Sequence, residues 1–434
     1  MRRLAVQVKG LIPNPGGKED EPMRVTVTQM LEIPDLDVSV KSIEEAVARA
    51  ARGFPSAAWQ AAVHCVETRA ASQHPAGSFR LKACEPRTLW TTSGPVTFRR
   101  RRFVSEDEQR SFLLFDLRVG LRPRRRTTAG ADRLLAETAA EATYSAAARF
   151  WARAWGEAPS AMAVWRATQR AGEDLVAERE RLRRRVFEDG DLPGWEKPPP
   201  EFVGVEADST YVAAWRGKGA SHEVYVGISY DGKEERRGRR RLKGKAVRAA
   251  LGGAKRFGEE LFASAQSAHN VTEAKAGVYL SDGAASLRVI QQDHFPRLAR
   301  QLDWAHAKRR VSEAYGREQS ARSSELIGRL AAGEREAVVS EVRSDAGRKR
   351  RRAEELRELA GYLEGPGADL YAVRRLRATG AELPEHLEGS GGIERQIGVL
   401  VGQRMKRRGM SWTRRGAERM LAVRQHLLNR LHPS

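Results

Sequence analysis

The segment DGDLPGWEKPPP at residues 189–200 constrains the fold of this chain more than any other stretch. It places four prolines and two glycines within twelve residues. Proline lacks the backbone N–H that helices and central strands need, and proline-rich runs favour stiff, extended backbone. The segment therefore predicts the end of a helix and a linker between two differently built parts. The 434 residues are also roughly two to three times the length of a typical domain, so several domains are expected.

The part before the linker begins with residues 1–85, to which the sequence assigns no role. A strand is expected at 4–8, and helices are expected over 42–52 and 56–72. Residues 86–130 form a β-rich basic region with the strand-like runs RTLWTT, VTFRRRRFV and RSFLLFDLRVGL. Because successive side chains of a strand point to opposite faces, its arginines divide between the two faces.

Residues 131–188 are expected to be helical. After the helix ADRLLAETAAEA, Ser145 can cap AAARFWARAW and Ser160 can cap AMAVWRATQRAG. Two helices joined by about four residues have the proportions of a helix-turn-helix.

In that interpretation, Ala161–Ala171 is the helix that reads DNA. Its candidate groove-facing side chains are Arg166, Gln169 and Arg170. The alternative is an ordinary helical hairpin in which Trp165 belongs to the core.

After the linker, residues 201–316 begin with two or three adjacent strands, followed by a helix near 246–268. Two strand–turn–helix segments come next. Strands in a meander that then alternate with helices predict an α/β fold, a mixed sheet flanked by helices. Residues 317–388 are charged and helical, and 389–434 contain two amphipathic helices around Gly409.

The charge of the chain indicates a polyanionic partner. Lysine and arginine number 77 against 56 aspartates and glutamates, a net charge of +21. The cations occur in runs, and arginine binds phosphate in a bidentate way. One run alone could equally be a solvated helix face, but the excess over all of them favours nucleic acid. The runs include the candidate DNA contacts Arg99, Arg100, Arg101, Arg102, Lys406, Arg407 and Arg408.

Other classes of protein are disfavoured by composition. No apolar run approaches the ~18 residues of a membrane span, and the amino terminus lacks the apolar block of a signal peptide. Two cysteines, Cys65 and Cys84, are too few for a disulfide framework or a cysteine-based zinc site. We therefore expect a soluble, cytoplasmic protein that associates with the nucleoid and has no membrane partner.

Two carboxylates follow apolar strand-like runs. Asp208 ends FVGVEAD, and Asp282 ends GVYLSD before a glycine turn. Acidic residues at the carboxyl ends of core strands lie where ligands and metals collect, and Mg²⁺ prefers oxygen ligands. A two-metal site needs a further acid, and Glu394 fits because it opens a helix directly after GSGG. Asp208 or Asp282 alone could equally be a turn residue, and for Glu394 alone a helix-start residue is the favoured interpretation. Spacing does not exclude Glu206, on the same strand face as Asp208.

Asp303 and His306 form a further feature, LDWAH, at the end of another strand-like stretch. The pair could orient a DNA strand at the site. Without other context, a helix-capping aspartate beside a satisfied histidine is the favoured interpretation.

The runs VEADSTYV, LSDGA, QLDWAHAKRR and GGIERQIGVLVGQRMKRRGMSW occur in this order. In order and spacing they resemble bacterial insertion-sequence transposases of the DDE class, close to the Mutator type. The likeness extends over roughly 86–425. It implies a ribonuclease-H-like core over 201–316 and 389–434, interrupted by a helical insertion at 317–388.

The resemblance also implies roles for the candidate residues. Asp208, Asp282 and Glu394 would be the catalytic acids and would hold two Mg²⁺ ions, for which Mn²⁺ would substitute. Asp303 and His306 would be accessory active-site residues. The enzyme would cut DNA at the element's ends and join the freed 3′-hydroxyl to target DNA, acting on double-stranded DNA as a homodimer or higher oligomer.

Two alternatives remain open at this point. One is a transposase-derived DNA-binding protein without catalysis. The other is a structure-specific nuclease on the same fold, which would cut DNA but not join it.

Overall fold

The computed structural model describes most of the chain, with gaps. The described residues are 27, 39–73, 78–105, 110–193, 198–216, 219–236, 239–348, 350–365, 369–385, 387, 392–407 and 409–431. The strand expected at 4–8 lies outside them. The chain divides into two compact units, Met1–Arg170 and Ala171–Ser434. No helix in the described part of the chain is both long and apolar enough to cross a membrane.

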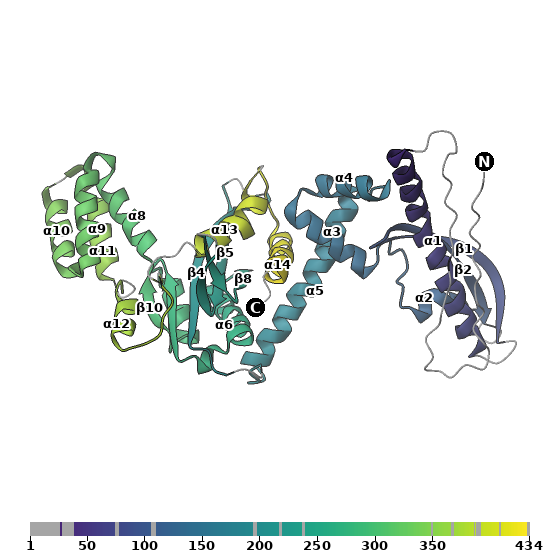
Figure 1. Ribbon diagram of the computed structural model, residues 1–434, viewed down its shortest axis with the longest axis horizontal. Helices are drawn as coiled ribbons and strands as arrows, with labels where there is room; N and C mark the ends of the chain where they lie inside the picture. The colour runs from purple at the N-terminus through teal and green to yellow at the C-terminus, as the bar shows by residue number, and fades with distance from the viewer. Residues whose placement is uncertain are drawn as a thin grey trace. The chain divides into compact units, whose positions relative to one another are not determined.

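The first unit combines a three-stranded antiparallel sheet, in the order β1-β2-β3, with helices (Figure 1). Its elements are α1 (Val40–Ser72), β1 (Phe79–Thr91), β2 (Gly94–Ser105), β3 (Ser111–Leu113), α2 (Leu114–Arg118), α3 (Ala129–Glu141), α4 (Tyr144–Trp155) and the first part of α5 (Ala161–Phe187). Two predictions were wrong here. α1 runs through Pro55 as one helix instead of two. The third strand has only 3 residues and turns directly into α2.

Helix α1 continues through its proline because its side chains close the open edge of β2. Ser56 Oγ accepts from the Thr97 backbone N–H at 3.1 Å, and Gln60 Oε1 accepts from the Arg99 N–H at 2.7 Å. The Gln60 amide also donates to the Arg99 carbonyl at 3.1 Å. These bonds satisfy backbone groups that β3 is too short to pair.

Helices α3, α4 and α5 pack around Trp151, which is buried. The predicted cap at Ser160 is confirmed, because its side chain accepts from the Ala163 N–H at 3.2 Å. Thr143, and not Ser145, caps α4. Trp165 is 41% exposed, so it does not form the core of the pair. α5 also continues to Phe187, well beyond the predicted end of the recognition helix.

The second unit contains a five-stranded mixed sheet flanked by helices, as predicted, in the order β10-β9-β4-β5-β8 (Figure 1). β4, β9 and β10 are parallel, and β5 runs antiparallel to both β4 and β8. The elements around this sheet are β4 (Phe202–Ala213), β5 (Ser221–Tyr230), β6 (Gly232–Arg236), β7 (Arg239–Lys243), β8 (Ala246–Leu251), α6 (Ala254–His269), η1 (Val271–Glu273), β9 (Ala276–Ser281), α7 (Ala285–His294), β10 (Ala299–Leu302), α8 (Trp304–Tyr315), α13 (Gly392–Ile397), the π-helix η4 (Gly398–Lys406) and α14 (Arg414–Leu431).

The residues that were expected to start a helix at 246 form the edge strand β8 instead. Side chains from two helices satisfy its outer backbone groups. Asn429 of α14 accepts from the Val247 N–H at 2.9 Å and donates to the Val247 carbonyl at 3.2 Å. Arg179 of α5 donates to the Ala249 carbonyl at 3.1 Å.

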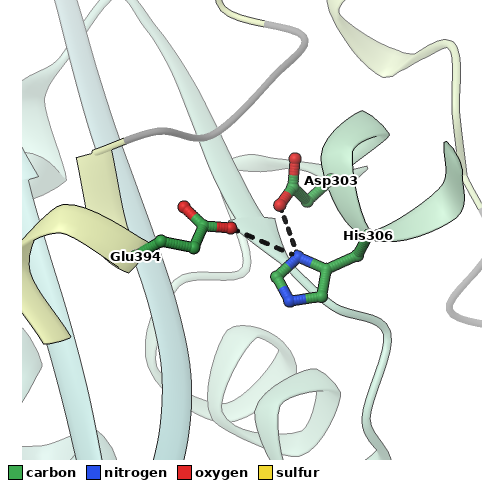
Figure 2. A group of neighbouring side chains, drawn as sticks. All are labelled: Asp303, His306 and Glu394. Atoms are coloured by element: carbon green, nitrogen blue, oxygen red, sulfur yellow. Dashed lines mark hydrogen bonds and ion pairs between the residues drawn. The ribbon is translucent and has the colours of Figure 1, made fainter. Parts of the chain in front are cut away.

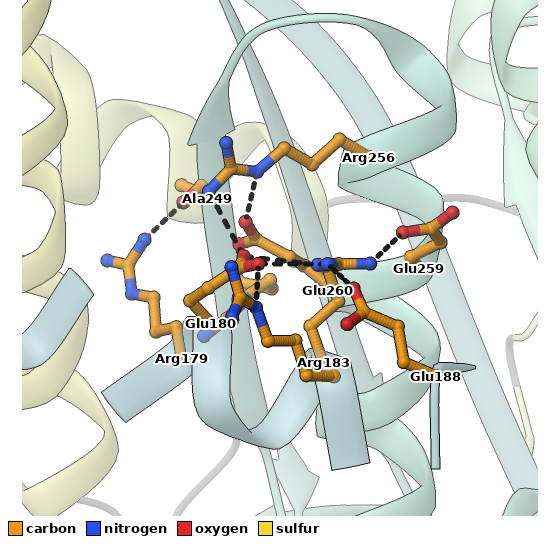
Figure 3. A network of polar contacts seen from close by, with 10 residues as sticks. Arg179, Glu180, Arg183, Glu188, Ala249, Arg256, Glu259 and Glu260 are labelled. Carbon is orange, nitrogen blue, oxygen red and sulfur yellow. Dashed lines mark hydrogen bonds and ion pairs between the residues drawn. The ribbon is translucent and has the colours of Figure 1, made fainter. Parts of the chain in front are cut away.

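Arginines and glutamates join the second half of α5 to α6 (Figure 3). Arg183 contacts Glu180 at 2.8 Å and Glu259 of α6 at 2.7 Å, and Arg256 of α6 contacts Glu180 at 3.3 Å. Part of the arginine excess therefore serves the fold and is already neutralised.

Further helices follow α8 within residues 317–388, and this segment is called the insertion below. Its elements are η2 (Arg317–Gln319), α9 (Ser320–Ala332), α10 (Arg335–Arg348), η3 (Arg350–Arg352), α11 (Ala353–Glu364) and α12 (Ala372–Ala378). These helices share one apolar core with α8. The Trp304 indole N–H donates to the Leu370 carbonyl at 3.1 Å, which ties the insertion to the start of α8.

Candidate active site

Asp208 lies in the middle of β4 and not at its end as predicted. The pairing between β4 and β9 ends at Glu206 opposite Leu280. Two residues further along each strand, the same register places Asp208 beside Asp282. On the other side, Leu302 of β10 is opposite Ser281, so Asp303 follows beside Asp282. Neighbouring strands lie about 4.8 Å apart. Three acids from three parallel strands therefore converge where β9 and β10 end.

The carboxylate of Asp208 is mostly buried, with 15% of the side chain exposed. It accepts the Ser209 backbone N–H at 2.7 Å. Burial raises the pKa of Asp208, the Ser209 hydrogen bond lowers it, and the negative charges of Asp282 and Glu394 raise it further. The charges of the other two predicted acids therefore both act on Asp208.

Asp282 lies in a tight turn after β9. Its side chain accepts from the Ala284 N–H at 2.8 Å, and Gly283 takes the left-handed backbone with φ of +87°. Tyr362 of the insertion donates its hydroxyl to the Asp282 carbonyl at 3.0 Å. Hydrogen bonds therefore hold both the side-chain carboxylate and the backbone carbonyl of Asp282.

Asp303 and His306 open helix α8. Asp303 caps the helix by accepting from the Ala305 N–H at 2.9 Å, and its other oxygen lies 2.5 Å from His306 Nδ1. This hydrogen bond raises the pKa of His306, burial opposes the rise, and the charges of Asp303 and Asp208 add to it. Asp303 therefore caps the helix as expected, and it also lies among the acids of the candidate site.

Glu394 comes from the first turn of α13, as predicted, and 38% of its side chain is exposed. Its carboxylate lies 3.5 Å from His306 Nδ1, and His306 Nε2 lies 4.0 Å from Asp208. Figure 2 shows Asp303 and Glu394 on two sides of the imidazole. One ligand atom from each of Asp303, His306 and Glu394 lies within 4.8 Å of the others, close enough to hold a metal ion.

The donor set fits a hard divalent cation. The pKa of Asp208 is raised mainly by burial and in part by the charges of Asp282 and Glu394, and a cation between these carboxylates would offset their repulsion. Mg²⁺ and Mn²⁺ accept such oxygen ligands. Asp208, Asp282 and Glu394 offer oxygens alone, whereas His306 Nδ1 is already engaged by Asp303.

Glu206, the alternative ligand that spacing left open, has a different environment. Its side chain is fully buried, and it accepts from the Tyr230 hydroxyl at 2.9 Å and from the Ile393 backbone N–H at 3.0 Å. Burial raises its pKa to about 7. A Cβ at Gly392 would lie 2.8 Å from its carboxylate. Glu206 therefore anchors the start of α13, next to Glu394.

The predicted DNA-binding arginines of β2 mostly have acidic partners. Arg100 is buried and pairs with Asp116. Arg101 pairs with Glu67 at 2.8 Å, Arg102 pairs with Glu85 at 2.5 Å, and Arg99 donates to the Cys84 carbonyl at 2.9 Å. These contacts fix the sheet and leave Arg99 the most exposed of the four.

The predicted groove-facing residues of α5 differ in exposure. Arg166 is exposed, Gln169 is buried, and Arg170 pairs with Asp132 at 2.7 Å. This pair raises the pKa of Arg170.

The basic run after η4 is only partly described. Lys406 contacts the Thr210 hydroxyl, Arg407 is exposed, and Arg408 lies outside the described residues. DNA binding by the basic residues of β2, of α5 and of the run 406–408 stays a prediction.

Sequence reasoning missed the supporting residues Tyr230 and Tyr362. Both contact the acids from far along the chain, at separations of 24 residues for Tyr230 and Glu206 and 80 residues for Tyr362 and Asp282. Neither tyrosine lies in a motif, so the sequence carried no signal for them.

The chain matches the model of an uncharacterised protein family, UPF0236, over residues 35–431, and it belongs to this family. No curated protein matches it. Among solved structures it is similar to the Drosophila P element transposase strand transfer complex, with 11% identity and a TM-score of 0.26. That match covers 73% of this chain and 82% of the other. The resemblance to Mutator-type transposases stays a prediction.

Proposed function

We propose that this protein is a metal-dependent DNA transposase that cuts DNA at the ends of a mobile element and joins the freed 3′-hydroxyl to target DNA. Two observations support the proposal. Asp303, His306 and Glu394 lie close enough to hold a metal ion, and the strand register brings Asp208 beside Asp282. A cation held there would offset the repulsion that the charges of Asp282 and Glu394 exert on Asp208.

The sheet supports a ribonuclease-H-like core. The strands β4, β5, β8, β9 and β10 are the first to fifth of the sheet in chain order. Across the sheet they follow one another as β10-β9-β4-β5-β8, that is, fifth, fourth, first, second and third. Only the second strand is antiparallel to the others. This arrangement is the one expected of that core, and it places an acid of the first strand beside an acid that follows the fourth.

The chemistry divides between the metal and the chain. Two Mg²⁺ ions held by Asp208, Asp282 and Glu394 would supply Lewis acidity to the phosphodiester and to its attacking oxygen. The first reaction adds water across a P–O bond and leaves a 3′-hydroxyl and a 5′-phosphate. In the second, that 3′-hydroxyl displaces a 3′-oxygen of the target strand, so one phosphodiester replaces another and the proton passes to the leaving oxygen.

Asp303 and His306 hold the geometry for these steps. Asp303 fixes the imidazole through Nδ1 at 2.5 Å, so that Nε2 points toward Asp208. The raised pKa of His306 favours the imidazolium, which offsets part of the acids' charge.

Replacement of Glu394 by glutamine tests the proposal. Glu394→Gln is expected to lower strand cleavage at least about 100-fold and to leave DNA affinity nearly unchanged. The matched control is Glu273→Gln, the same change at an exposed position. Cleavage by Glu394→Gln at the rate of the unmodified protein would remove Glu394 from the ligand set. Cutting without joining by the unmodified protein would favour a nuclease, and binding alone would favour a DNA-binding relative.

A further inference from the structure

One face of helix α8 leads from the acids to an exposed cation. Asp303, His306 and Arg310 are three and then four residues apart, so they lie above one another on the same face. Asp303 and His306 are buried, whereas Arg310 is exposed. Arg310 therefore lies one helical turn beyond the histidine, at the rim of the candidate site.

A tyrosine of the insertion holds this arginine in place. The guanidinium of Arg310 lies 4.7 Å from the centre of the Tyr362 ring. The hydroxyl of the same tyrosine donates to the Asp282 carbonyl at 3.0 Å. Such a cation–π contact is worth about 0.5–1 kcal/mol at an exposed site. One aromatic ring thus connects a catalytic acid to a cation.

Both acids and arginines influence the pKa of Tyr362. Burial raises the pKa of Tyr362, the charges of Asp282 and Asp303 raise it further, and those of Arg310 and Arg309 lower it. The hydroxyl of Tyr362 contacts Asp282 and its ring contacts Arg310, so the tyrosine bridges an acid and an arginine. A substrate that carried a row of phosphates could place one at the acids and the next at the arginines.

The guanidinium of Arg310 is available to bind an anion. Among the described residues it forms no ion pair, whereas Arg343 and Arg357 of the insertion pair with Glu364 and Glu354. The planar guanidinium donates two parallel N–H groups to a phosphate, and its position on the ring reduces the entropy lost on binding.

We propose that Arg310, supported by Tyr362, binds a backbone phosphate of the DNA strand that enters the active site. The inference rests on the proposed function, because it needs a DNA strand at the acids. It gives the insertion a part in substrate binding. The ligand is the phosphodiester backbone, and base sequence plays no role in the contact.

The test measures binding in full-length protein that carries Asp208→Ala, which removes cleavage and one repelling carboxylate. The probe is a labelled duplex of random sequence, titrated over a range of salt concentrations. Arg310→Gln is expected to lower affinity about 3- to 10-fold and to reduce the steepness of the salt dependence by about 0.9 in the log–log slope. Arg310→Lys keeps the charge and is expected to keep the slope. Arg357→Gln, the same change in an arginine paired within its own helix, is expected to leave both unchanged.

Each outcome decides the inference. An unchanged slope in Arg310→Gln, with or without a lower melting temperature, would overturn it and leave Arg310 as a contact between α8 and α11. An equal change in Arg357→Gln would also overturn it, because the effect would then reflect net charge. If the parent protein bound no DNA, the proposed function would fall together with the inference, whereas failure of Arg310 alone would leave that function standing.

Discussion

Glu206 and Asp208 lie two residues apart on one face of β4, yet their surroundings give them different chemistry. Glu206 is enclosed and accepts two hydrogen bonds, from Tyr230 and from the backbone of Ile393. Asp208 stays partly open and faces other acids. The first therefore supports α13, and the second is available to a cation. The two-residue repeat of a strand predicts that Glu206 and Asp208 share a face. Their different environments depend on residues far along the chain, which the repeat does not predict.

The raised pKa of Glu206 predicts a dependence of stability on pH. Its pKa of about 7 in the fold exceeds the ordinary 4.5, so the folded state holds a proton that the unfolded state releases. That stability is fully present below pH 4.5 and is lost as pH rises through 7. Glu206→Gln cannot ionise, so its stability relative to the unmodified protein is expected to improve by up to about 3 kcal/mol between pH 5 and 8.

Urea unfolding with EDTA present measures this difference. Glu201→Gln, at an exposed position just before the same strand, is the control and is expected to show no such trend. A Glu206→Gln protein whose relative stability stayed constant across this range would show that Glu206 is already ionised at low pH.

At the scale of elements, the three-stranded and the five-stranded sheet each have an edge whose backbone groups are satisfied by helix side chains. α1 closes β2 through Ser56 and Gln60, and α14 closes β8 through Asn429. Edge strands with unpaired backbone groups otherwise bind other chains. The long helices thus have a second role besides burying apolar surface.

Removing such a contact is expected to destabilise the second unit. Asn429→Ala leaves the backbone N–H and carbonyl of Val247 without their partner, at a cost of about 1–3 kcal/mol in the free energy of unfolding. Arg430→Ala, at the next and exposed position, is expected to cost less than about 0.5 kcal/mol. Equal losses in the two variants would show that the side chain of Asn429 does not support β8.

The elements differ in how far the sequence predicts them. The alternation of strands and helices after residue 201, the helical insertion and the helix that begins before Glu394 follow from local periodicity. The strand β8 was missed because three of the six residues of AVRAAL are alanine, and its pairing with β5 overrides the helical preference of alanine. The helix break at Pro55 was wrong because contacts with β2 hold α1 together.

At the scale of the whole molecule, the net charge of +21 is not uniformly available to a partner. Arg100, Arg102 and Arg183 pair with acids inside their own units. Runs of arginine in the sequence therefore overestimate the DNA-binding surface, since pairing depends on residues far along the chain. If the proposed function holds, exposed cations such as Arg166, and Arg310 without an ion pair in the described part, are expected to contribute most to DNA binding.

Binding to random duplex DNA is expected to depend steeply on salt. Each neutralised phosphate releases counterions and adds about −0.9 to the slope of log affinity against log salt concentration. Fluorescence anisotropy over a range of salt measures this slope. A flat response would contradict the assignment of a nucleic-acid partner.

The most direct test of the account is strand cleavage and joining on a supercoiled plasmid that carries the DNA flanking the gene. The reactions contain Mg²⁺, or EDTA, or the Asp208→Ala protein. The account predicts joined products with Mg²⁺ alone, and their loss both in EDTA and in the variant. Tight binding to these ends with no cut in Mg²⁺ or Mn²⁺, or cutting that Asp208→Ala retains, would contradict it.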